Sequence, residues 1–516
     1  MGSEKADLVL HDGGILGHPE SDSVAIGDGR IVAHGRYHEL KSHIGPRTHM
    51  VRLGGRVLAP GFIDCHQHFL EGAAVAAGLS LVRCRTIRDL LADLRVAAGK
   101  TPPGNWLRAF GYDEALMYER RSPTRDELDK AVPKNPLRLR HQTLHASCLN
   151  SRAIAALGLE SDQFVPPEGA RMLRDATGRL SGLFVGMEEW LSGRLPRVTA
   201  AEMESRARFY SHDLAANGIT AFTDATVRNG SEEVAAFSRL AAGGSIKQRV
   251  SLMLGPQYLK DIHVLRKAAA ASGMQIAGVK FMHVARWEPA RLAQTIIGAV
   301  EQNADCAFHV TEIEELDAVV RACQRGWPQI AQGPVSQLRI EHGGLIPPEY
   351  PEQIAAIGAW VVTNPGFIYY RGAKYAAESG LVPYLYRGQS LSESGIKLAG
   401  GTDAPVTPAK PLHAIAAAVA RFSLEGYELA PAEGLTIDAA FALFTRSAAR
   451  LSRLPAGEIM TGRLADLIVL PADPTKLQPA ELMNLAVETT IVGGQIIYER
   501  GRPLASQAAG MPLFSS

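Results

Sequence analysis

The chain has 516 residues, of which 46% are hydrophobic, and its mean hydropathy is −0.02, as in a folded protein with a large core. Its 54 Lys and Arg residues almost cancel its 53 Asp and Glu residues, which leaves a formal net charge of +1. This balance excludes a broad electrostatic attraction to nucleic acid or to an anionic membrane, so we expect neither as a partner. The length exceeds that of one ordinary domain, but it suits a large barrel with an added domain.

The amino-terminal stretch MGSEKADLVLHDGG lacks the apolar segment of a secretory signal peptide. The chain also has no uninterrupted apolar run of roughly 18 residues or more, so no membrane-spanning helix is expected. Its five cysteines are an odd number, widely scattered and without a C-x-x-C pair. This distribution argues against a disulfide framework or a zinc ribbon, and it indicates reduced thiols in a cytoplasmic protein.

Short apolar stretches separated by glycine-containing turns occupy both ends of the chain. The first sixty residues contain DLVLHDG, SVAIGDGRIVAHG and HMVRLGGRVLAPG, and the far end contains ADLIVLPADP and VETTIVGGQIIYERGRPL. Such patterns are typical of β-hairpins. Because either piece alone is too small to bury a core, we predict that residues 1–58 and 453–516 pair into one small β-sandwich domain.

The middle of the chain, residues 59–452, alternates strand-like apolar runs with helix-like segments. The strand-like runs are one that ends at His68 and others at 218–225, 249–255, 278–284, 305–310, 338–343, 358–365 and 395–405. Between them, stretches such as EPARLAQTIIGAVEQNA and EIEELDAVVRACQRG space apolar residues as a helix does. Eight strands joined largely by helices predict an α/β fold, a parallel (β/α)8 TIM barrel. One connection is too long for a single loop and helix, and it predicts an inserted subdomain at about 73–217.

Metal-competent side chains stand near the carboxyl ends of the predicted strands, where barrels build their active sites. They are His66, His68, Lys280, His309, His342 and Asp403. Because strand side chains alternate faces, His66 and His68 point the same way and can share one metal ion. Each residue alone also has a structural reading, as a hydrogen-bonded histidine, a helix-capping aspartate or a lysine packed along the core. Their concurrence at one end of the barrel favours a metal site.

These motifs together resemble the amidohydrolase superfamily of metal-dependent hydrolases. The matching stretches are APGFIDCHQH, VKF, FHV, IEHG and GGTDAP, followed by TGRLADLIVLPADP. The inserted stretches LRLRHQTLHASCLNSRAIAALGL and DATGRLSGLFVG resemble the branch that includes N-substituted formamide deformylase. The resemblance covers nearly the whole chain, and it is specific for the superfamily but far less so for the substrate.

The resemblance implies a metal role for each imidazole and for the carboxylate. His66 and His68 would bind the more buried metal together with Asp403. His309 and His342 would bind a second metal. These ligands are compatible with zinc, which we expect, and also with iron or manganese.

The number of ions depends on Lys280. The resemblance implies that this lysine bridges two metals as an N-carboxylated side chain, formed with carbon dioxide from a neutral amine. An unmodified lysine is a cation and cannot be a ligand, so the site would then hold one ion. We therefore expect one or two divalent metals per chain.

The site predicts a metal-dependent hydrolase that cleaves a C–N bond in an amide, an N-formyl group or a cyclic amide of a small molecule. Metal-activated hydroxide would attack the carbonyl carbon, and Asp403 would take the proton of the water and deliver it to the leaving nitrogen. Hydrolysis of an ester or carbamate, or C–C hydrolysis or decarboxylation, would be alternatives at the same site. A binding or regulatory protein that kept the barrel without catalysis is a further alternative, and the complete ligand set counts against it.

Residues outside the metal set are candidates for substrate contacts. By the resemblance, His145 of the insertion faces the active site and assists catalysis, although packing of the insertion would explain it equally well. After the lysine of the fourth strand, VKFMHVARWEP places His283 and Trp287 where that branch has an Asp-Gly stretch. His283 has three interpretations there, as a substrate ligand, as an extra metal ligand or as a loop histidine only. Cys65, between the first two histidines, points away from them by strand alternation and is expected to pack against helices.

The loop after the seventh strand, TNPGFIYYRGAKY, offers two aromatic side chains and a guanidinium. Tyr369, Tyr370 and Arg371 are suited to a flat or acidic part of a substrate, or alternatively to covering the core. The resemblance also implies a homodimer. No nucleotide-binding fingerprint occurs between a strand and a helix, so no nucleotide cofactor is expected.

Overall fold

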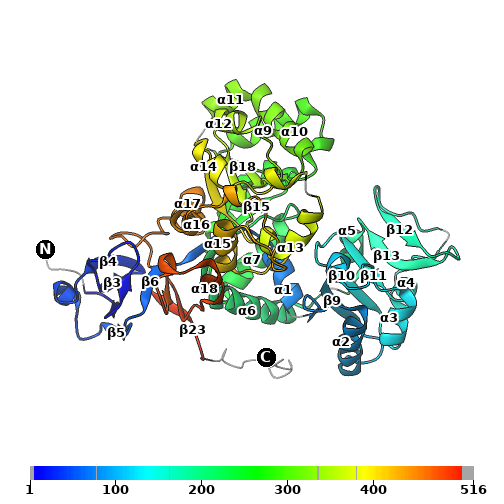
Figure 1. Cartoon of the computed structure of the whole chain (residues 1–516), viewed down its shortest axis with the longest axis horizontal. Helices are drawn as coiled ribbons and strands as arrows, with labels where there is room; N and C mark the ends of the chain where they lie inside the picture. The colour runs from blue at the N-terminus through cyan, green and yellow to red at the C-terminus, as the bar shows by residue number, and fades with distance from the viewer. Residues whose placement is uncertain are drawn as a thin grey trace. The chain divides into compact units, whose positions relative to one another are not determined.

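The computed structural model describes residues 5–76, 78–161, 163–196, 198–333, 336–378 and 380–502. The chain divides into two compact units, one formed by Met1–Phe69 with Tyr210–Ser516 and the other by Leu70–Phe209. The first unit contains a barrel and a β-sandwich, and the second contains the insertion (Figure 1). Residues 503–516, which were included in the predicted sandwich, lie outside the described residues.

Eight parallel strands form the barrel. They are β7 (Phe62–Gln67), β14 (Ile219–Asp224), β15 (Arg249–Leu254), β16 (Gln275–Phe281), β17 (Asp305–Val310), β18 (Leu338–His342), β19 (Trp360–Thr363) and β20 (Lys397–Gly400). Neighbours in this list are hydrogen-bonded, and every ladder between them is parallel. The predicted (β/α)8 barrel is confirmed, because each of these strands falls on a predicted apolar run.

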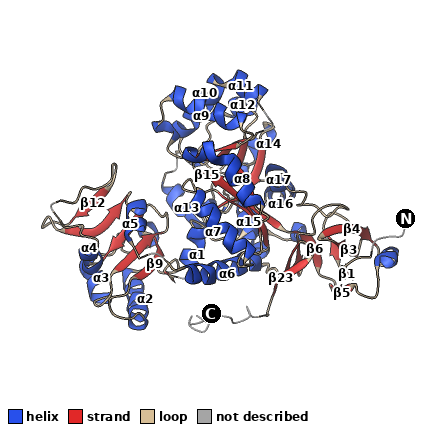
Figure 2. Ribbon diagram, turned by 180° about the vertical axis from the view of Figure 1, so that it is seen from behind, coloured by secondary structure: helices blue, strands red, loops and turns tan. Residues whose placement is uncertain are grey.

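Helices follow the strands and cover the barrel, as the ribbon coloured by secondary structure shows (Figure 2). They are α7 (Ser231–Ala242), α8 (Ile262–Ala270), α9 (Pro289–Glu301), α10 (Ile313–Arg325), α11 (Trp327–Gln332), α12 (Pro351–Ala356), α13 (Gly366–Ala377), α14 (Gln389–Glu393), α15 (Pro411–Ala420), α16 (Ile437–Leu443) and α17 (Arg446–Leu451). Two further helices, α1 (Phe69–Ala76) and α6 (Ala200–Ala216), contain the boundaries between the two units. The two helices predicted from apolar spacing are α9 and α10. In α9, Leu292, Ile296 and Val300 are buried at a spacing of four residues, which is one face of a helix.

The first and last strands meet at their carboxyl ends. The backbone N–H of Asp403 donates to the carbonyl of His66 over 2.7 Å, and the N–H of His68 donates to the carbonyl of Ala404 over 2.8 Å. Gly401 permits this approach, since a Cβ there would lie 2.6 Å from the Cβ of His66. The glycine in GGTDAP therefore brings the aspartate beside the two histidines.

Both ends of the chain build the β-sandwich of the first unit. One sheet contains β4 (Arg30–Gly35), β3 (Ser23–Gly27), β1 (Leu8–His11) and β5 (His49–Arg52), and the other contains β2 (Gly14–Ile15), β6 (Val57–Pro60), β21 (Leu467–Leu470), β22 (Thr489–Val492) and β23 (Gln495–Glu499). A further helix, α18 (Pro479–Asn484), lies between β21 and β22 in the chain. Leu10, Ile26, Leu467 and Ile491 are among the residues of its core, which draws on both sheets. Arg249 of the barrel donates to buried Asp466 over 2.6 Å, which links the two parts of this unit.

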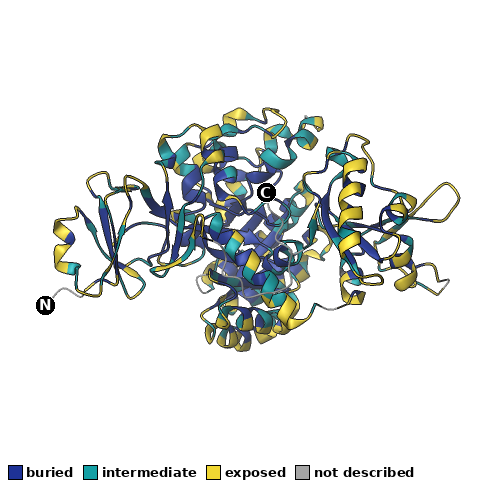
Figure 3. Cartoon of the chain, turned by 90° about the horizontal axis from the view of Figure 1, so that it is seen from below, coloured by how far each residue is buried: buried dark blue, intermediate teal, exposed yellow. Residues whose placement is uncertain are grey.

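The second unit is built on a six-stranded sheet. Its order is β12 (Arg171–Arg174), β13 (Leu180–Val185), β11 (Ala146–Leu149), β10 (Leu137–His141), β9 (Leu107–Tyr112) and β8 (Leu79–Ser80). Its helices are α2 (Ile87–Lys100), α3 (Arg125–Ala131), α4 (Ser151–Ala156) and α5 (Glu188–Arg194). Leu90, Leu94, Leu128 and Leu139 belong to a buried core of its own. Dark interiors surrounded by exposed helix faces mark both units in the view coloured by burial (Figure 3).

None of the described helices combines the length and the apolar character needed to cross a bilayer. All five cysteines are free and buried. Cys65 lies in a cluster with Ala448 and Ala449 of α17, and its Sγ is 3.9 Å from the hydroxyl of Ser452. This position matches the expectation that Cys65 packs against helices.

Candidate metal centre

Two histidines and an aspartate converge at the carboxyl end of the barrel. The Nε2 atom of His66 lies 3.4 Å from Oδ1 of Asp403, and Nε2 of His68 lies 3.1 Å from the same oxygen. Their ligand atoms all fall within 4.8 Å of one another. His66 and Asp403 are buried, and His68 is half-buried at the end of β7. Two imidazole nitrogens and a carboxylate in this arrangement can hold one divalent metal.

A second pair of imidazoles adjoins the first. Nε2 of His342, at the end of β18, lies 3.0 Å from Nδ1 of His309 on β17. The ring centroids of His66 and His342 are 4.7 Å apart. The backbone of His342 has a φ of 70°, a left-handed conformation that L-residues adopt at a cost of roughly 1–3 kcal/mol. Asp403 has a φ of 57°, so strained backbone recurs within the group.

Lys280 on β16 completes the set of residues predicted from the sequence. It is 1% exposed, and its Nζ has no hydrogen-bond partner among the described residues. Burial lowers its pKa to about 8, and the nearby carboxylates of Glu341 and Asp403 oppose that shift. A buried amine without a partner beside imidazoles and carboxylates fits a centre that is completed by another group.

The hydrogen-bond partners of Nδ1 determine which ring nitrogen of His66 and of His342 has a free lone pair. Nδ1 of His66 is hydrogen-bonded to Oε2 of Glu341, and Nδ1 of His342 lies 2.8 Å from Oδ1 of Asn364. The Asn364 side-chain amide donates to the carbonyl of Gly401 over 2.8 Å, so its oxygen faces His342. A carboxylate oxygen and an amide oxygen only accept, so the ring protons sit on Nδ1. The Nε2 lone pairs of both rings are therefore available for a metal.

The third imidazole, His68, is hydrogen-bonded to Asp403 through Nε2 and to Thr226 through Nδ1. Nδ1 of His68 lies 2.8 Å from the hydroxyl of Thr226, which can donate or accept. Burial alone would raise the pKa of Asp403, but the hydrogen bond from His68 and the nearby imidazoles of His342 and His66 hold that pKa well below its ordinary value. Asp403 is thus a carboxylate, the form in which it can bind a metal or accept a proton.

Asp64, which was not predicted, ties the ends of β7 and β20 together. It accepts from the hydroxyl of Thr402 over 2.5 Å and from the Thr402 backbone N–H over 2.9 Å. It also accepts from the backbone N–H of His66 over 3.1 Å. Burial raises the pKa of Asp64 to about 7. Asp64 precedes His66 by two residues, so strand alternation places both on the same face of β7, and this spacing would have revealed it.

The predicted loop after the seventh strand is wrong in part, because residues 366–377 form helix α13. Apolar residues at three- and four-residue spacing in GFIYYRGAKYAA favour that helix. Two predicted substrate residues contact protein there. The hydroxyl of Tyr370 lies 2.8 Å from Nδ1 of His413, and the ring of Tyr369 lies 6.1 Å from that of Phe422.

Phe367, one turn earlier on the same helix, reaches the candidate centre. Its ring centroid lies 6.5 Å from that of His342, and the ring of Tyr386 stacks on it at 5.7 Å. The guanidinium of Arg371 lies 5.5 Å above the Phe367 ring. Among the predicted substrate residues on α13, Arg371 therefore adjoins the aromatic rings beside His342. The i, i+4 spacing of Phe367 and Arg371 would have revealed this face had the segment been taken as a helix.

Three further predicted residues lie elsewhere. His283 is exposed and has a φ of 52° in the turn after β16. The Trp287 indole donates to the carbonyl of Met282 over 3.2 Å and packs edge-on against Phe281. His145 belongs to the second unit, where it is exposed just before β11. Its role in catalysis stays a prediction.

The second unit contains another group of metal-competent residues, which sequence reasoning did not find. Nε2 of His141 lies 3.0 Å from Oε2 of Glu114 and 3.7 Å from Oδ1 of Asp113. Nδ1 of His141 accepts from the backbone N–H of Thr143 over 3.0 Å. The neutral ring must then carry its proton on Nε2, and the charged ring carries one there as well. The His141 ring therefore presents a proton to the carboxylates, and the group is a histidine–carboxylate cluster.

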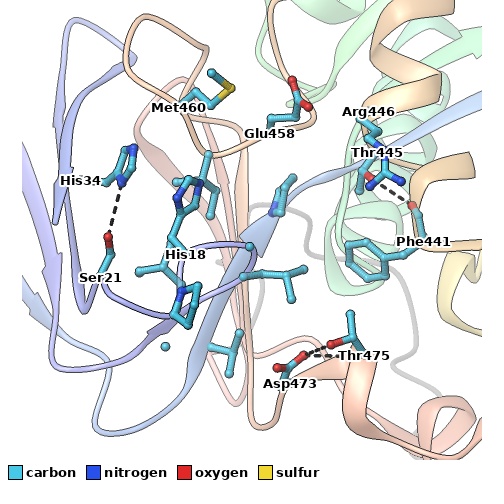
Figure 4. Close-up of a pocket in the computed structure, with 18 of the residues that line it drawn as sticks. His18, Ser21, His34, Phe441, Thr445, Arg446, Glu458, Met460, Asp473 and Thr475 are labelled. Atoms are coloured by element: carbon cyan, nitrogen blue, oxygen red, sulfur yellow. Dashed lines mark hydrogen bonds between the residues drawn. The ribbon is translucent and has the colours of Figure 1, made fainter. Parts of the chain in front are cut away.

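A large open pocket of 1050 Å³ lies away from the candidate centre (Figure 4). His18 and His34 line it on the sandwich side, and Thr445 and Arg446 line it on the barrel side. The pocket adjoins Pro60, two residues before the amino end of β7, whereas the predicted ligands stand at carboxyl ends of strands. None of the described residues that line it was predicted as a site residue.

The chain is similar to known hydrolases over most of its length. The model of the amidohydrolase family matches residues 50–498. N-substituted formamide deformylase of Arthrobacter pascens is 26% identical, over 93% of this chain and 95% of that protein. The putative amidohydrolase YtcJ of Bacillus subtilis (strain 168) is also 26% identical, over 93% of this chain and 96% of its own length.

Solved structures show the same fold. An uncharacterized metal-dependent hydrolase from Pyrococcus horikoshii OT3 superposes with a TM-score of 0.71 at 20% identity, covering 92% of this chain and 99% of the other. One from Pyrococcus furiosus superposes with a TM-score of 0.68 at 21% identity, covering 91% and 100%. The family match spans well over half of the chain and includes every residue of the candidate centre. The chain therefore belongs to the amidohydrolase family and is a hydrolytic enzyme that acts on carbon–nitrogen bonds.

Proposed function

We propose that the enzyme hydrolyses an amide, an N-formyl amine or a cyclic amide of a small molecule at the site formed by His66, His68 and Asp403. The observation that carries this proposal is the approach of two Nε2 atoms to one Asp403 oxygen, at 3.4 and 3.1 Å, at the carboxyl end of a buried barrel. A divalent metal held by these donors, with zinc favoured by their chemistry, would acidify water and polarise the carbonyl group of the substrate.

Asp403 is the residue that we propose to move the proton. Its ionised carboxylate accepts a proton from the attacking water as the new C–O bond forms at the carbonyl carbon. It then donates that proton to the nitrogen as the C–N bond breaks. The products are a carboxylic acid and an amine, and Asp403 returns to its starting state.

Lys280 is proposed to carry a carboxyl group on Nζ. Addition of the neutral amine to carbon dioxide, with loss of one proton, would turn an orphaned buried cation into an anionic ligand. The closeness of the pair His309 and His342 to His66 supports two ions per chain in that case. With an unmodified lysine, one ion would remain at His66, His68 and Asp403.

The wall beside His342 suggests the kind of substrate. The stacked rings of Phe367 and Tyr386 form an apolar surface next to that imidazole. The similarity to a protein named N-substituted formamide deformylase supports a substrate with an organic group on its nitrogen. Arg371 above Phe367 would accommodate an aromatic or acidic end of that group.

Turnover of matched substrates tests the bond that is cleaved. N-substituted formamides, secondary amides, cyclic amides and the corresponding esters are assayed with the wild type and with Asp403→Asn. We expect cleavage of at least one amide class, and a fall in kcat of roughly 10²- to 10⁴-fold in the variant. Asp438→Asn, an exposed aspartate at the start of α16, is the control and should leave kcat unchanged. Hydrolysis of esters alone would contradict the assignment to C–N bonds.

Metal content per chain tests the composition of the centre. The wild type and Lys280→Ala are purified without chelator, and bound metal is measured by mass spectrometry. About two ions in the wild type and fewer in the variant would support a carboxylated lysine bridge. About one ion in both would assign a mononuclear centre to His66, His68 and Asp403. No metal in either protein would contradict the proposed mechanism.

A further inference from the structure

We propose that Glu341 is a positioning residue, held by Arg339, that fixes the ring of His66 with its Nε2 lone pair toward the metal centre. The inference rests on the metal-dependent function proposed above and concerns residues that would not touch the substrate. Both side chains are buried, at 0% and 1% exposure.

Each oxygen of the Glu341 carboxylate faces a different donor. Nε of Arg339 donates to Oε1 over 2.7 Å, and Nδ1 of His66 donates to Oε2. Arg339 also donates through Nη2 to the backbone carbonyl of Cys65 over 2.8 Å. The pair thereby contacts both the ring of His66 and the peptide group just before it. Rotation of the ring would break the bond to Glu341, so the network sets both its orientation and its tautomer.

Stability alone gives a weak reason for this buried pair. Removing two charges from water costs several kcal/mol per ion, roughly what their attraction returns, so apolar residues of similar volume are often as stable. An apolar side chain at position 341 would, however, leave the Nδ1 proton of His66 without an acceptor. The proton would then be as stable on Nε2, which lies 3.4 Å from Asp403 and must be bare to bind a metal.

Glu341 also differs in charge from the partners of the neighbouring imidazoles. Through Nδ1, His342 and His68 are hydrogen-bonded to neutral groups, the amide of Asn364 and the hydroxyl of Thr226. Among these three rings, His66 alone has a carboxylate at Nδ1, which makes its Nε2 the stronger donor. We therefore expect His66 to contribute more to metal affinity than His68 does.

Glu341→Gln is the informative substitution because it preserves shape and removes one acceptor. Glutamine offers one oxygen and one NH2 group to two donors, Arg339 and His66. If its oxygen faces Arg339, its NH2 group forces the His66 proton onto Nε2. If its oxygen faces His66, the NH2 group opposes the Arg339 guanidinium. Neither orientation satisfies both partners, so the His66 ring loses its fixed tautomer.

Asp305→Asn supplies a matched control. Asp305 is 1% exposed and accepts two hydrogen bonds from Arg453, over 2.9 and 2.7 Å, at the amino end of β17. Its substitution also replaces a buried carboxylate that is paired with an arginine by an isosteric amide, far along the strand from the candidate ligands; Arg453 itself is exposed. Loss of stability common to both variants can thus be separated from an effect on the centre.

The experiment measures zinc affinity by competition with a chromophoric chelator, together with urea unfolding of the metal-free proteins. We expect Glu341→Gln to weaken zinc binding by roughly 10- to 100-fold, and Asp305→Asn to leave it unchanged. The visible absorption band of cobalt-substituted protein should shift in the first variant and not in the second. Equal zinc affinity in Glu341→Gln and the wild type would overturn the proposal.

A second measurement covers the case in which Glu341→Gln does not fold. The imidazole ¹⁵N signals of the metal-free wild type are recorded, and those of His66 are identified by their loss in His66→Ala. A protonated Nδ1 with a bare Nε2 supports the positioning role, and the reverse tautomer overturns it. If zinc binding responds as expected but no amide is hydrolysed, the proposed function is wrong and the role of Glu341 stands.

Discussion

Two groups of histidines and carboxylates in this chain have similar compositions, but His66 in one and His141 in the other carry the ring proton on opposite nitrogens. In the barrel, His66 and His68 meet Asp403, and in the insertion His141 meets Asp113 and Glu114. Both groups bring three possible metal ligands within 4.8 Å. They differ in what faces the outer nitrogen of the ring. An acceptor oxygen of Glu341 faces Nδ1 of His66, whereas the backbone N–H of Thr143 faces Nδ1 of His141.

From this difference we infer that proximity of ligand atoms does not by itself make a metal site. A histidine binds a metal through a bare nitrogen, and its other nitrogen must then carry the proton. Glu341 stabilises that tautomer in the barrel, and Thr143 stabilises the opposite tautomer in the insertion. The group that is hydrogen-bonded to Nδ1 therefore distinguishes a histidine that is a candidate metal ligand from one that donates to a carboxylate.

Removing an imidazole from each group gives the largest predicted contrast. His66→Ala and His68→Ala should each lower bound metal, and turnover should fall by about 10³-fold or more, because a catalytic metal supplies several kcal/mol. His141→Ala should leave metal content unchanged. Metal analysis and kcat measured on the same preparations check this. Loss of metal in His141→Ala, or full retention in His66→Ala, would contradict the contrast.

The sequence predicted the barrel, and it predicted which side chains stand near the carboxyl ends of the strands, because both depend on local patterns. Buried parallel strands are nearly continuous apolar runs, and His66 and His68 stand on a regular strand whose alternation holds. The sheet of the insertion has shorter strands and mixed pairing, and its presence was predicted only as a subdomain. Long-range pairing of that kind leaves little periodic trace in a sequence.

Glu341 was missed for a physical reason that lies in one backbone angle. Alternation would place Glu341 and His342 on opposite faces of β18. The φ of 70° at His342 ends that alternation, so adjacent residues both serve the centre. Phe367 was missed because its segment was expected to be a loop, in which helical spacing has no meaning. Tertiary context set the first feature, whereas local apolar spacing indicated the second.

Thr226→Val removes the neutral partner of Nδ1 of His68, and it should lower zinc affinity less than the removal of an imidazole does. Valine keeps the shape but removes the hydroxyl that lies 2.8 Å from Nδ1 of His68. We expect zinc affinity to fall by roughly 10-fold, the lower end for such partners. Thr220→Val is the control, since that buried hydroxyl donates to the carbonyl of Phe62 on the adjacent strand. Equal effects of the two valines on zinc affinity would show that Thr226 acts through stability alone.

Cys65→Ala tests which face of β7 serves the centre. Burial raises the pKa of this thiol to about 12, so it is protonated and unsuited to bind a metal. Its contacts are with α17 and Ser452. The variant should keep its metal and turnover, and should lose about 1 kcal/mol of unfolding free energy with the buried sulfur atom. A drop in metal content would place Cys65 in the centre.

The smallest predicted effect is the pH-dependent stability of the insertion cluster. Burial alone would lower the pKa of His141, but hydrogen bonding to Asp113 and Glu114 raises it above its ordinary 6.5. The hydrogen bond from His141 lowers the pKa of Glu114 below its ordinary 4.5. The histidine contribution is thus complete below pH 6.5 and is lost as the pH rises through its folded pKa. The Glu114 contribution is complete above pH 4.5 and is lost as the pH falls through its own.

His141→Gln should therefore cost most stability between these two values and least at alkaline pH. We expect a difference of about 1 kcal/mol or less, because the Glu114 side chain is 46% exposed and solvent screens the pair. Urea unfolding of the wild type and the variant across pH 4 to 9, roughly the range that spans both groups, measures this difference. A cost that does not change with pH would mean that His141 acts by packing. A cost that depends on added zinc would instead make the insertion cluster a metal site, and the tautomer rule drawn from the two groups would fail.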